Sequence, residues 1–265
     1  MEDINNASGA TGLEAVETKT NELISISELF KKTWNIYRIG VWKFVKVQLA
    51  GWLGVLPLVI VFGIFFGFSV LLKGYVGFKL VIILVGLLAV LALFFLVYFV
   101  ILSQIASYLL IKDFSLEKKI VVLFKEAMPF VGRFFWTSFL AGIFLFLWFL
   151  LLIIPGIIYA IFYSFTSWVV IFEGFSGIAA IKRSKELVSG YWWAVLLRYL
   201  VIGAAYYIIV FILAIPGGFM GEESMAFKIW NIATTIVQIV LSPFPFIFTY
   251  FVYGNLVKIK AANIK

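Results

Sequence analysis

The sequence predicts an all-α, polytopic membrane protein with six transmembrane helices in three hairpins, each preceded by a basic amphipathic interfacial helix. Three observations support this: apolar segments of membrane-spanning length, a one-sided distribution of Lys and Arg, and a basic segment that recurs before each pair of spans. Of the 265 residues, 64% are hydrophobic and 13% are charged, about half the charged share of a typical soluble domain. Lipid must therefore solvate most of the chain.

The N-terminal segment differs from the rest. Residues 1–24 are polar, small and acidic, and they lack the basic start and apolar core of a cleavable signal peptide. Such a segment buries too little apolar surface to offset its ordering entropy. We expect a disordered cytoplasmic tail over residues 1–24 and a single six-helix transmembrane domain over residues 25–265.

Apolar runs fill the remaining sequence. They lie at about residues 47–72, 80–111, 134–154, 157–172, 191–215 and 229–257. A hydrocarbon core of about 30 Å takes roughly 20 helical residues to cross, so five runs are long enough and the fourth is short. Pro155 and Gly156 separate the third and fourth runs. One helix over both runs would extend about 60 Å, so we expect a tight hairpin that turns at these two residues.

The basic residues test this count, because cytoplasmic loops of membrane proteins accumulate Lys and Arg. With six spans, all but three of the 21 basic residues fall on one side; the exceptions are Lys73, Lys79 and Lys228. A single crossing over residues 134–172 would remove this bias. We therefore expect both termini in the cytoplasm and the chain in the cell membrane, either inner or plasma.

A basic segment with helical periodicity precedes each pair of spans. The apolar faces comprise Phe30, Trp34, Tyr37, Val41 and Val45 in the first; Ile120, Leu123, Phe124 and Ala127 in the second; Ala180, Ile181, Ser184, Leu187 and Val188 in the third. Each segment ends in a glycine followed by aromatic residues, at Gly40, Gly132 and Gly190. We expect the chain to turn into the bilayer at these glycines, with the apolar faces toward lipid.

The same segments supply the candidate contacts to anionic lipid headgroups on the cytoplasmic side. These are Lys31, Lys32, Lys118, Lys119, Lys182 and Arg183. A basic residue beside an anionic leaflet contributes about 1 kcal/mol of attraction. Membrane contact thus explains the net charge of +8, and nucleic acid is not expected as a partner. A membrane-protein partner remains open.

Two charged residues lie in or beside apolar runs. Glu173 closes the fourth run, where it could bind a cation, pair with Arg183 or Lys182, or hold a cytoplasmic helix against the bundle; the last is favoured. Arg198 lies in the fifth run, about 10 Å along the helix after Tyr191. Its side chain is expected to reach back to the interface rather than to line a polar pathway.

Neutral polar residues and prolines also fall within the spans. Gln104, Asn231, Gln238 and Asn255 are expected to hydrogen-bond between helices. Pro216 with Gly217 is expected to end the fifth span. The prolines Pro243 and Pro245 lie inside the sixth run and predict a kink, with a functional gate as an open alternative.

The residue inventory argues against an enzyme. The chain has no cysteine and no histidine, which removes thiolate nucleophiles, the commonest zinc ligands and the side chain that titrates near neutrality. It has no phosphate-binding glycine loop, no HExxH and no GxSxG sequence. We expect no catalytic residue, no metal and no cofactor.

One stretch carries a set of spaced motifs. They are Ile154 to Gly156, Glu173 with Gly174, Ala180 with Ser184, and Trp192 with Trp193. With these motifs, residues 151–193 resemble the membrane domain attached to some glycerophosphodiester phosphodiesterases, and related stand-alone bacterial membrane proteins of unknown function. The resemblance implies six helices and no enzyme, because the fused proteins carry their activity on a separate soluble barrel with metal-binding acidic and histidine residues.

These observations favour a membrane module without catalytic activity that organises lipid or a partner protein through its basic helices. The alternative is a small transporter or permease for a hydrophobic or amphipathic solute. A membrane-depth cavity lined by Gln104, Arg198 or Gln238 would favour the transporter. An intramembrane enzyme would need a second acid in a cleft with Glu173.

Overall fold

The computed structural model describes residues 23–71, 78–113 and 118–263. These residues are largely helical, and no strand occurs among them, which confirms the all-α class. Six helical stretches within the described ranges are long and apolar enough to cross a membrane, as a multi-pass membrane protein requires. The predicted tail lies outside the described residues up to residue 22. Leu23 and Ile24, also assigned to that tail, instead pack against the core.

The helices follow one another with short connections. In chain order they are α1 (Ile26–Gly51), η1 (Trp52–Val55), α2 (Leu56–Leu71), α3 (Phe78–Asp113), α4 (Ile120–Ala127), η2 (Met128–Phe130), α5 (Val131–Leu151), α6 (Ile153–Tyr163), α7 (Thr166–Phe172), α8 (Gly177–Val188), α9 (Trp192–Ala214), η3 (Pro216–Phe219), α10 (Met225–Leu241) and α11 (Pro243–Ala262), where η marks a short 3-10 helix. Contacts join α2 to α3, α5 to α6, and α9 to α10.

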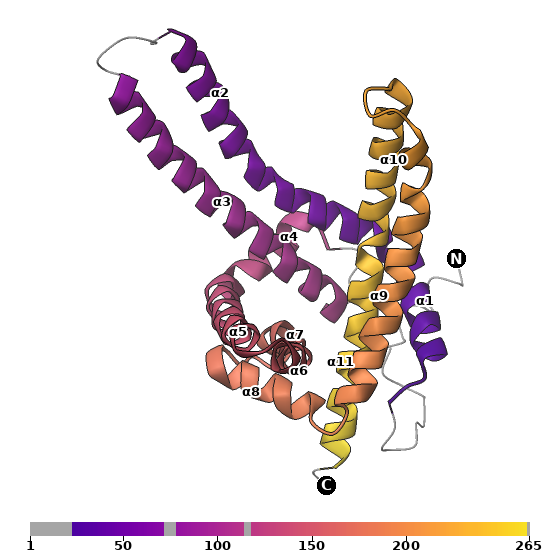
Figure 1. Ribbon diagram of the computed structural model, residues 1–265. Helices are drawn as coiled ribbons and strands as arrows, with labels where there is room; N and C mark the ends of the chain where they lie inside the picture. Colours follow the sequence, from indigo (N-terminus) through magenta and orange to yellow (C-terminus); the bar gives the residue numbers. More distant parts are fainter. Residues whose placement is uncertain (1–22, 72–77, 114–117, 264–265) are drawn as a thin grey trace.

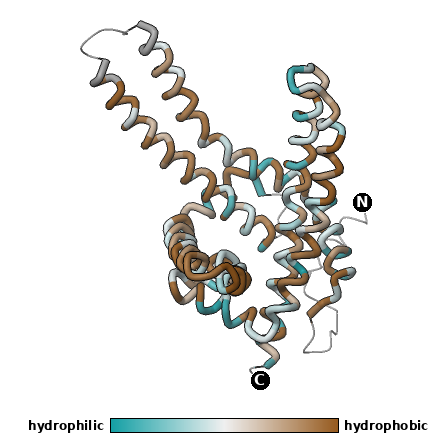
Figure 2. The backbone as a smooth tube through the Cα atoms, viewed as in Figure 1, coloured by the Kyte–Doolittle hydropathy of each residue, from teal (hydrophilic) through white to brown (hydrophobic). Residues whose placement is uncertain are grey.

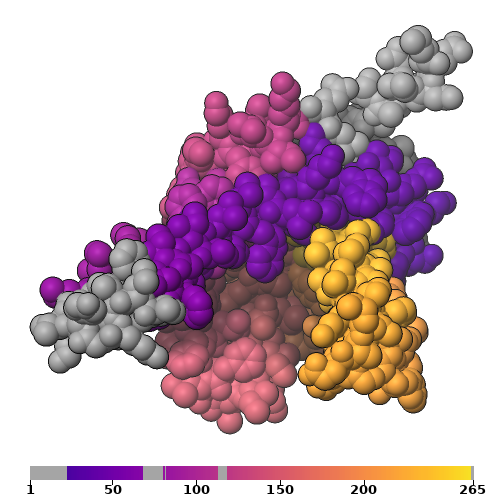
Figure 3. Space-filling view, turned by 90° about the horizontal axis from the view of Figure 1, so that it is seen from above, coloured from indigo at the N-terminus to yellow at the C-terminus, as the bar shows by residue number. Residues whose placement is uncertain are grey.

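These three helix pairs extend from a shared core in different directions (Figure 1). Seen from above, α2 and α3 extend to the left, α5 and α6 toward the bottom, and α9 with α10 toward the lower right (Figure 3). The outer part of α2 and α3 is mainly hydrophobic, whereas that of α9 and α10 is a mixture of hydrophobic and hydrophilic residues (Figure 2). Exposed apolar surface of this extent marks contact with lipid rather than with water.

Burial along α3 shows how the core and the outer parts divide. Leu102 and the residues from Ile105 to Ile111 are buried, whereas most large side chains from Leu80 to Val100 are exposed. With 36 residues, α3 is about 54 Å long, well beyond the roughly 30 Å of a hydrocarbon core. One end of this helix therefore packs in the core, and the other end presents apolar side chains to lipid.

Aromatic rings at the centre of the core join helices from distant parts of the chain. Trp168 of α7 is 2% exposed. It stacks on Phe246 of α11 with ring centroids 4.9 Å apart and meets the edge of Tyr108 of α3 at 4.5 Å. Phe44 of α1 lies 6.1 Å from Phe246. Such pairs add about 0.5–1.5 kcal/mol each beyond the burial of their area.

Of the three predicted glycine turns, only the one at Gly190 is present. Gly190 has φ +85°, and α9 begins two residues later. The other two predictions are wrong. Gly40 is buried inside α1, and Gly132 lies in the first turn of α5. The residues Tyr37, Val41 and Phe44 continue one buried face through Gly40, and this packing outweighs the cost of about 1 kcal/mol for glycine in a helix.

The predicted turn at Pro155 and Gly156 is also misplaced. The chain leaves the helix at Leu152, which is extended with φ −162° and ψ 145°, so both residues lie in the first turn of α6. Proline is tolerated there because the first N–H groups of a helix have no partner in any case. The fourth apolar stretch therefore runs from Ile153 to Phe172, 20 residues, with an interruption between α6 and α7. This stretch is long enough to span a membrane, whereas the sequence suggested that it was too short.

The other two proline sites behave as predicted. α9 ends at Ala214, just before Pro216. At Pro243 the helix is interrupted, because α10 ends at Leu241 and α11 begins at Pro243.

Substitution of Gly54 tests the contact between η1 and α3. A Cβ at this position would lie 2.9 Å from both Leu96 Cα and Phe99 Cβ, neither of which moves unless α3 shifts. Gly54→Ala should therefore cost about 1–3 kcal/mol of stability and lower the thermal unfolding temperature of the protein in detergent, followed by tryptophan fluorescence. The control is Gly63→Ala, whose Cβ has nothing within 4 Å. Equal unfolding temperatures for the two variants would contradict the contact.

Candidate functional site

Glu173 connects three helices at the end of α7. Its Oε2 accepts a hydrogen bond from Arg183 Nε at 2.7 Å, and its Oε1 accepts one from Tyr253 OH at 2.9 Å. Arg183 lies on α8 and Tyr253 on α11. The contact between Glu173 and Arg183, one of those considered from the sequence, is thus present, and Lys182 does not make it. The site holds α8 against α7 and α11.

The chemistry of this site is that of a structural tie. Burial alone would lower the pKa of Arg183, but the hydrogen bond and the charge of Glu173 outweigh it and raise that pKa. Glu186, 3.5 Å from Arg183, is 66% exposed. No group of three or more His, Cys, Asp or Glu residues that could hold a metal occurs in the described part of the chain. Both oxygens of Glu173 are already bonded, so the cluster offers no acid and base pair.

Ser184 bridges the interruption between α6 and α7, a role that the sequence did not reveal. Its Oγ accepts a hydrogen bond from Phe165 N at 3.2 Å and donates one to Phe162 O at 2.7 Å. These backbone groups would otherwise be unpaired in a buried site. The signals in the sequence were the place of Ser184 on the apolar face of its helix and its pairing with Ala180 in one of the spaced motifs.

Arg198 is buried, with 8% of its surface exposed. Its side chain extends back toward the start of α9, as expected, but it ends inside the protein. There it donates hydrogen bonds to Ala194 O and to Ile24 O, and Asn255 Oδ1 accepts one from Ile24 N at 2.9 Å. Arg198 and Asn255 therefore fix the backbone just before α1.

The six candidate headgroup residues divide into two groups. Lys32 pairs with Glu28 at 3.0 Å, Lys118 with Glu126 at 3.1 Å, and Arg183 with Glu173. The other three are Lys31, Lys119 and Lys182. They are exposed, and no ion pair engages them within the described residues. The sequence could not separate the two groups, because the pairing depends on side-chain geometry.

Gln104 lines a pocket where α1, α3 and the start of α11 meet. The pocket holds about 330 Å³ and is also lined by Gln48, Ser103 and Ser242. Ser242 Oγ donates to Gln48 Oε1 at 2.8 Å, and Ser103 Oγ donates to Val47 O at 3.0 Å. The side-chain amide of Gln104 itself is bonded to nothing in the part of the chain that the structure describes, so the hydrogen bond expected between helices is absent here.

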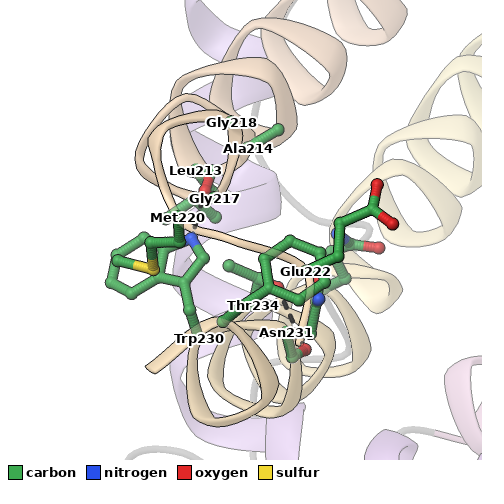
Figure 4. A pocket seen from close by; sticks show the side chains of 11 residues that line it. Leu213, Ala214, Gly217, Gly218, Met220, Glu222, Trp230, Asn231 and Thr234 are labelled. Carbon is green, nitrogen blue, oxygen red and sulfur yellow. Dashed lines mark hydrogen bonds between the residues drawn. The ribbon is translucent and has the colours of Figure 1, made fainter. Parts of the chain in front are cut away.

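A second polar pocket, of about 320 Å³, follows the seam between α9 and α10 (Figure 4). Its lining residues are Leu213, Ala214, Gly217, Gly218, Met220, Glu222, Phe227, Trp230, Asn231, Thr234 and Gln238. The interhelical hydrogen bonds expected for Asn231 and Gln238 are absent, since neither side-chain amide is bonded within the parts of the chain that the structure describes. The sequence alone does not distinguish these two amides from amides that bond between helices.

Comparison with protein-family models, curated proteins and solved structures found no match for this chain. The resemblance of residues 151–193 to the phosphodiesterase-associated membrane domain therefore stays a prediction from its motifs. Side chains from these motifs make contacts between helices, since Glu173 and Ser184 bond as described above and Trp192 Nε1 donates to Ile158 O at 3.1 Å.

Glu173→Ala tests the tie. It leaves Arg183 and Tyr253 without their acceptor, and hydrogen bonds to a charged group contribute about 1.5–3 kcal/mol. We expect a loss of about 2 kcal/mol in unfolding free energy, measured by denaturant titration in detergent. The matched control is Glu186→Ala, which removes an exposed contact to the same arginine and should cost less than about 0.5 kcal/mol. Similar losses for the two variants would refute a special role for Glu173.

Proposed function

We propose that this protein is a membrane module without catalytic activity that organises lipid in the cell membrane. In this proposal the three helix pairs are hairpins that cross the bilayer, and the basic segments and both termini lie on the cytoplasmic side. The observation that carries it is the set of exposed lysines, Lys31, Lys119 and Lys182, one on each segment that precedes a helix pair. Their exposure leaves them available to anionic headgroups.

The burial of α8 and α4 refines how these segments would meet the membrane. Ala180, Ser184 and Leu187 of α8 are 0% exposed, as are Leu123 and Ala127 of α4. The apolar faces of both helices thus pack against protein, whereas the sequence suggested lipid. The proposed contact with lipid is therefore made by the charged face toward headgroups, while the outer parts of the helix pairs contact acyl chains.

Neutralising the three exposed lysines tests the proposal. The triple variant Lys31→Gln, Lys119→Gln, Lys182→Gln should lose about 1 kcal/mol of attraction per lysine, or about a hundredfold in preference for anionic lipid at low ionic strength. Retention of phosphatidylglycerol over phosphatidylcholine is measured by native mass spectrometry of protein released from nanodiscs. The triple Lys→Arg variant keeps the charge and should retain lipid like the parent. Unchanged retention in the glutamine variant would refute the proposal.

A permease for an amphipathic solute is the second candidate, and the two polar pockets support it. Gln104 lines one and Gln238 the other. Ser242, which lines the first pocket, lies one helical turn from Gln238, and Ser242 N donates to Gln238 O at 2.9 Å. The two pockets thus follow one line along the sixth apolar stretch, as the wall of a solute path would.

Cysteine labelling separates the two candidates, because the chain has no native cysteine. A permease requires Gln238→Cys to react with a membrane-impermeant thiol reagent from one side and to be protected when the solute path closes. Ile236→Cys is the control, since Ile236 is 56% exposed on the apolar surface of α10 and should not react. If Gln238→Cys is as unreactive as the control, the permease candidate fails.

A further inference from the structure

The pocket between α9 and α10 places unpaired polar groups in an apolar helix pair. Asn231, Thr234 and Gln238 recur on α10 at steps of three and four residues, so they share one helix face. Thr234 satisfies its hydroxyl by donating to Asn231 O at 3.0 Å, but the amides of Asn231 and Gln238 are bonded to nothing in the described chain. Asn231 is exposed and Gln238 is half-buried, and both line the pocket. Their amides are therefore free to bond a polar ligand in it.

The charges of the side chains that line the pocket favour one kind of ligand. Glu222 is the one ionisable side chain that lines the pocket, and no lysine or arginine does so. An anion would therefore meet a carboxylate without a compensating cation. A metal ion would find a single carboxylate, whereas calcium takes six to eight oxygen ligands. An organic cation fits better, because one counter-ion and a few neutral acceptors suffice for it.

The aromatic wall of the pocket adds a second feature suited to a cation. Phe227 and Trp230 line it together with Glu222, and Figure 4 labels the last two. The indole is held in place because Trp230 Nε1 donates to Leu213 O at 3.0 Å. Opposite, Gly217 has no side chain, and a Cβ there would lie 3.4 Å from Trp230 Cδ1. Ring faces attract ammonium groups within about 6 Å.

We propose that this pocket binds a ligand that carries an ammonium group, either the amine headgroup of a lipid or a free amine. Glu222 is the counter-ion, and Trp230 and Phe227 contact the cation. The amides of Asn231 and Gln238, about 10 Å apart along α10, bond the neutral polar groups of the ligand. The site is separate from the exposed lysines of the proposed function, whose chemistry is that of an anion receptor.

The test uses the full chain and two probes. Ethanolamine is titrated into detergent-solubilised protein by calorimetry, and retention of phosphatidylethanolamine over phosphatidylglycerol is measured by native mass spectrometry from nanodiscs. Binding of ethanolamine identifies a free-amine site, whereas selective lipid retention without it identifies a headgroup site. Glu222→Gln should weaken the observed binding about tenfold, as expected for the loss of a charge-assisted bond. Glu223→Gln is the matched control and should bind like the parent, since Glu223 does not line the pocket.

Several outcomes would overturn the proposal. If Glu222→Gln and Glu223→Gln bind equally well, Glu222 is not the counter-ion. If the parent protein binds neither probe, the pocket is not a site for amines. If neutral ethylene glycol competes as well as ethanolamine, the charge has no role. Asn231→Leu serves as a second variant: a change in oligomeric mass with unaltered amine or lipid binding would make this face an interface between copies of the chain. Unchanged unfolding temperatures show that each variant is folded. The lysine variants of the proposed function leave this readout untouched, so either proposal can fail alone.

Discussion

The packing of aromatic rings around Trp168 is the constraint on which the rest of the structure depends. The outer parts of the three helix pairs are largely exposed, so the direction of each pair is set where it enters the core. There Trp168 contacts rings from α3 and α11, and Phe246 carries the contact on to α1. Because rings of this size pack in few arrangements, the cluster restricts the angles between α1, α3, α7 and α11.

Polar side chains bond the backbone or join helices at three places where helices begin or end. Ser184 satisfies the backbone between α6 and α7, Arg198 and Asn255 bond the segment before α1, and Glu173 joins α7 to α8 and α11. In a medium of low dielectric constant each unpaired group would be costly. Glu173, Arg198 and Asn255, three of the charged and amide residues that the sequence places in or beside apolar runs, are thus engaged in contacts between segments of the core.

Two kinds of polar surface lie outside this core, and they differ in charge. The exposed lysines precede the helix pairs, whereas the pocket with Glu222 lies by the connection between α9 and α10, at the opposite end of the apolar stretches. In the two proposals above, the lysines form an anion receptor and the pocket forms a cation receptor. Both chemistries match parts of phospholipid headgroups.

The sequence by itself determined the class of this protein. The free energy of transferring a helix to lipid is the sum of contributions from its residues, so apolar spans can be recognised from the sequence alone. The positions of lysine and arginine between the spans can be counted in the same way. The six apolar stretches and the interruption at Pro243 could therefore be predicted. The tertiary structure decided what depends on distant partners: the continuous helix through Gly40, the turn at Leu152 instead of Pro155, and the burial of Arg198 against Ile24. Hydrogen bonds and ring packing join residues far apart in sequence, as in the bond between Arg198 and Ile24. For that reason only the folded chain separates Asn255, whose amide is bonded, from Gln104, Asn231 and Gln238, whose amides are not bonded within the described residues.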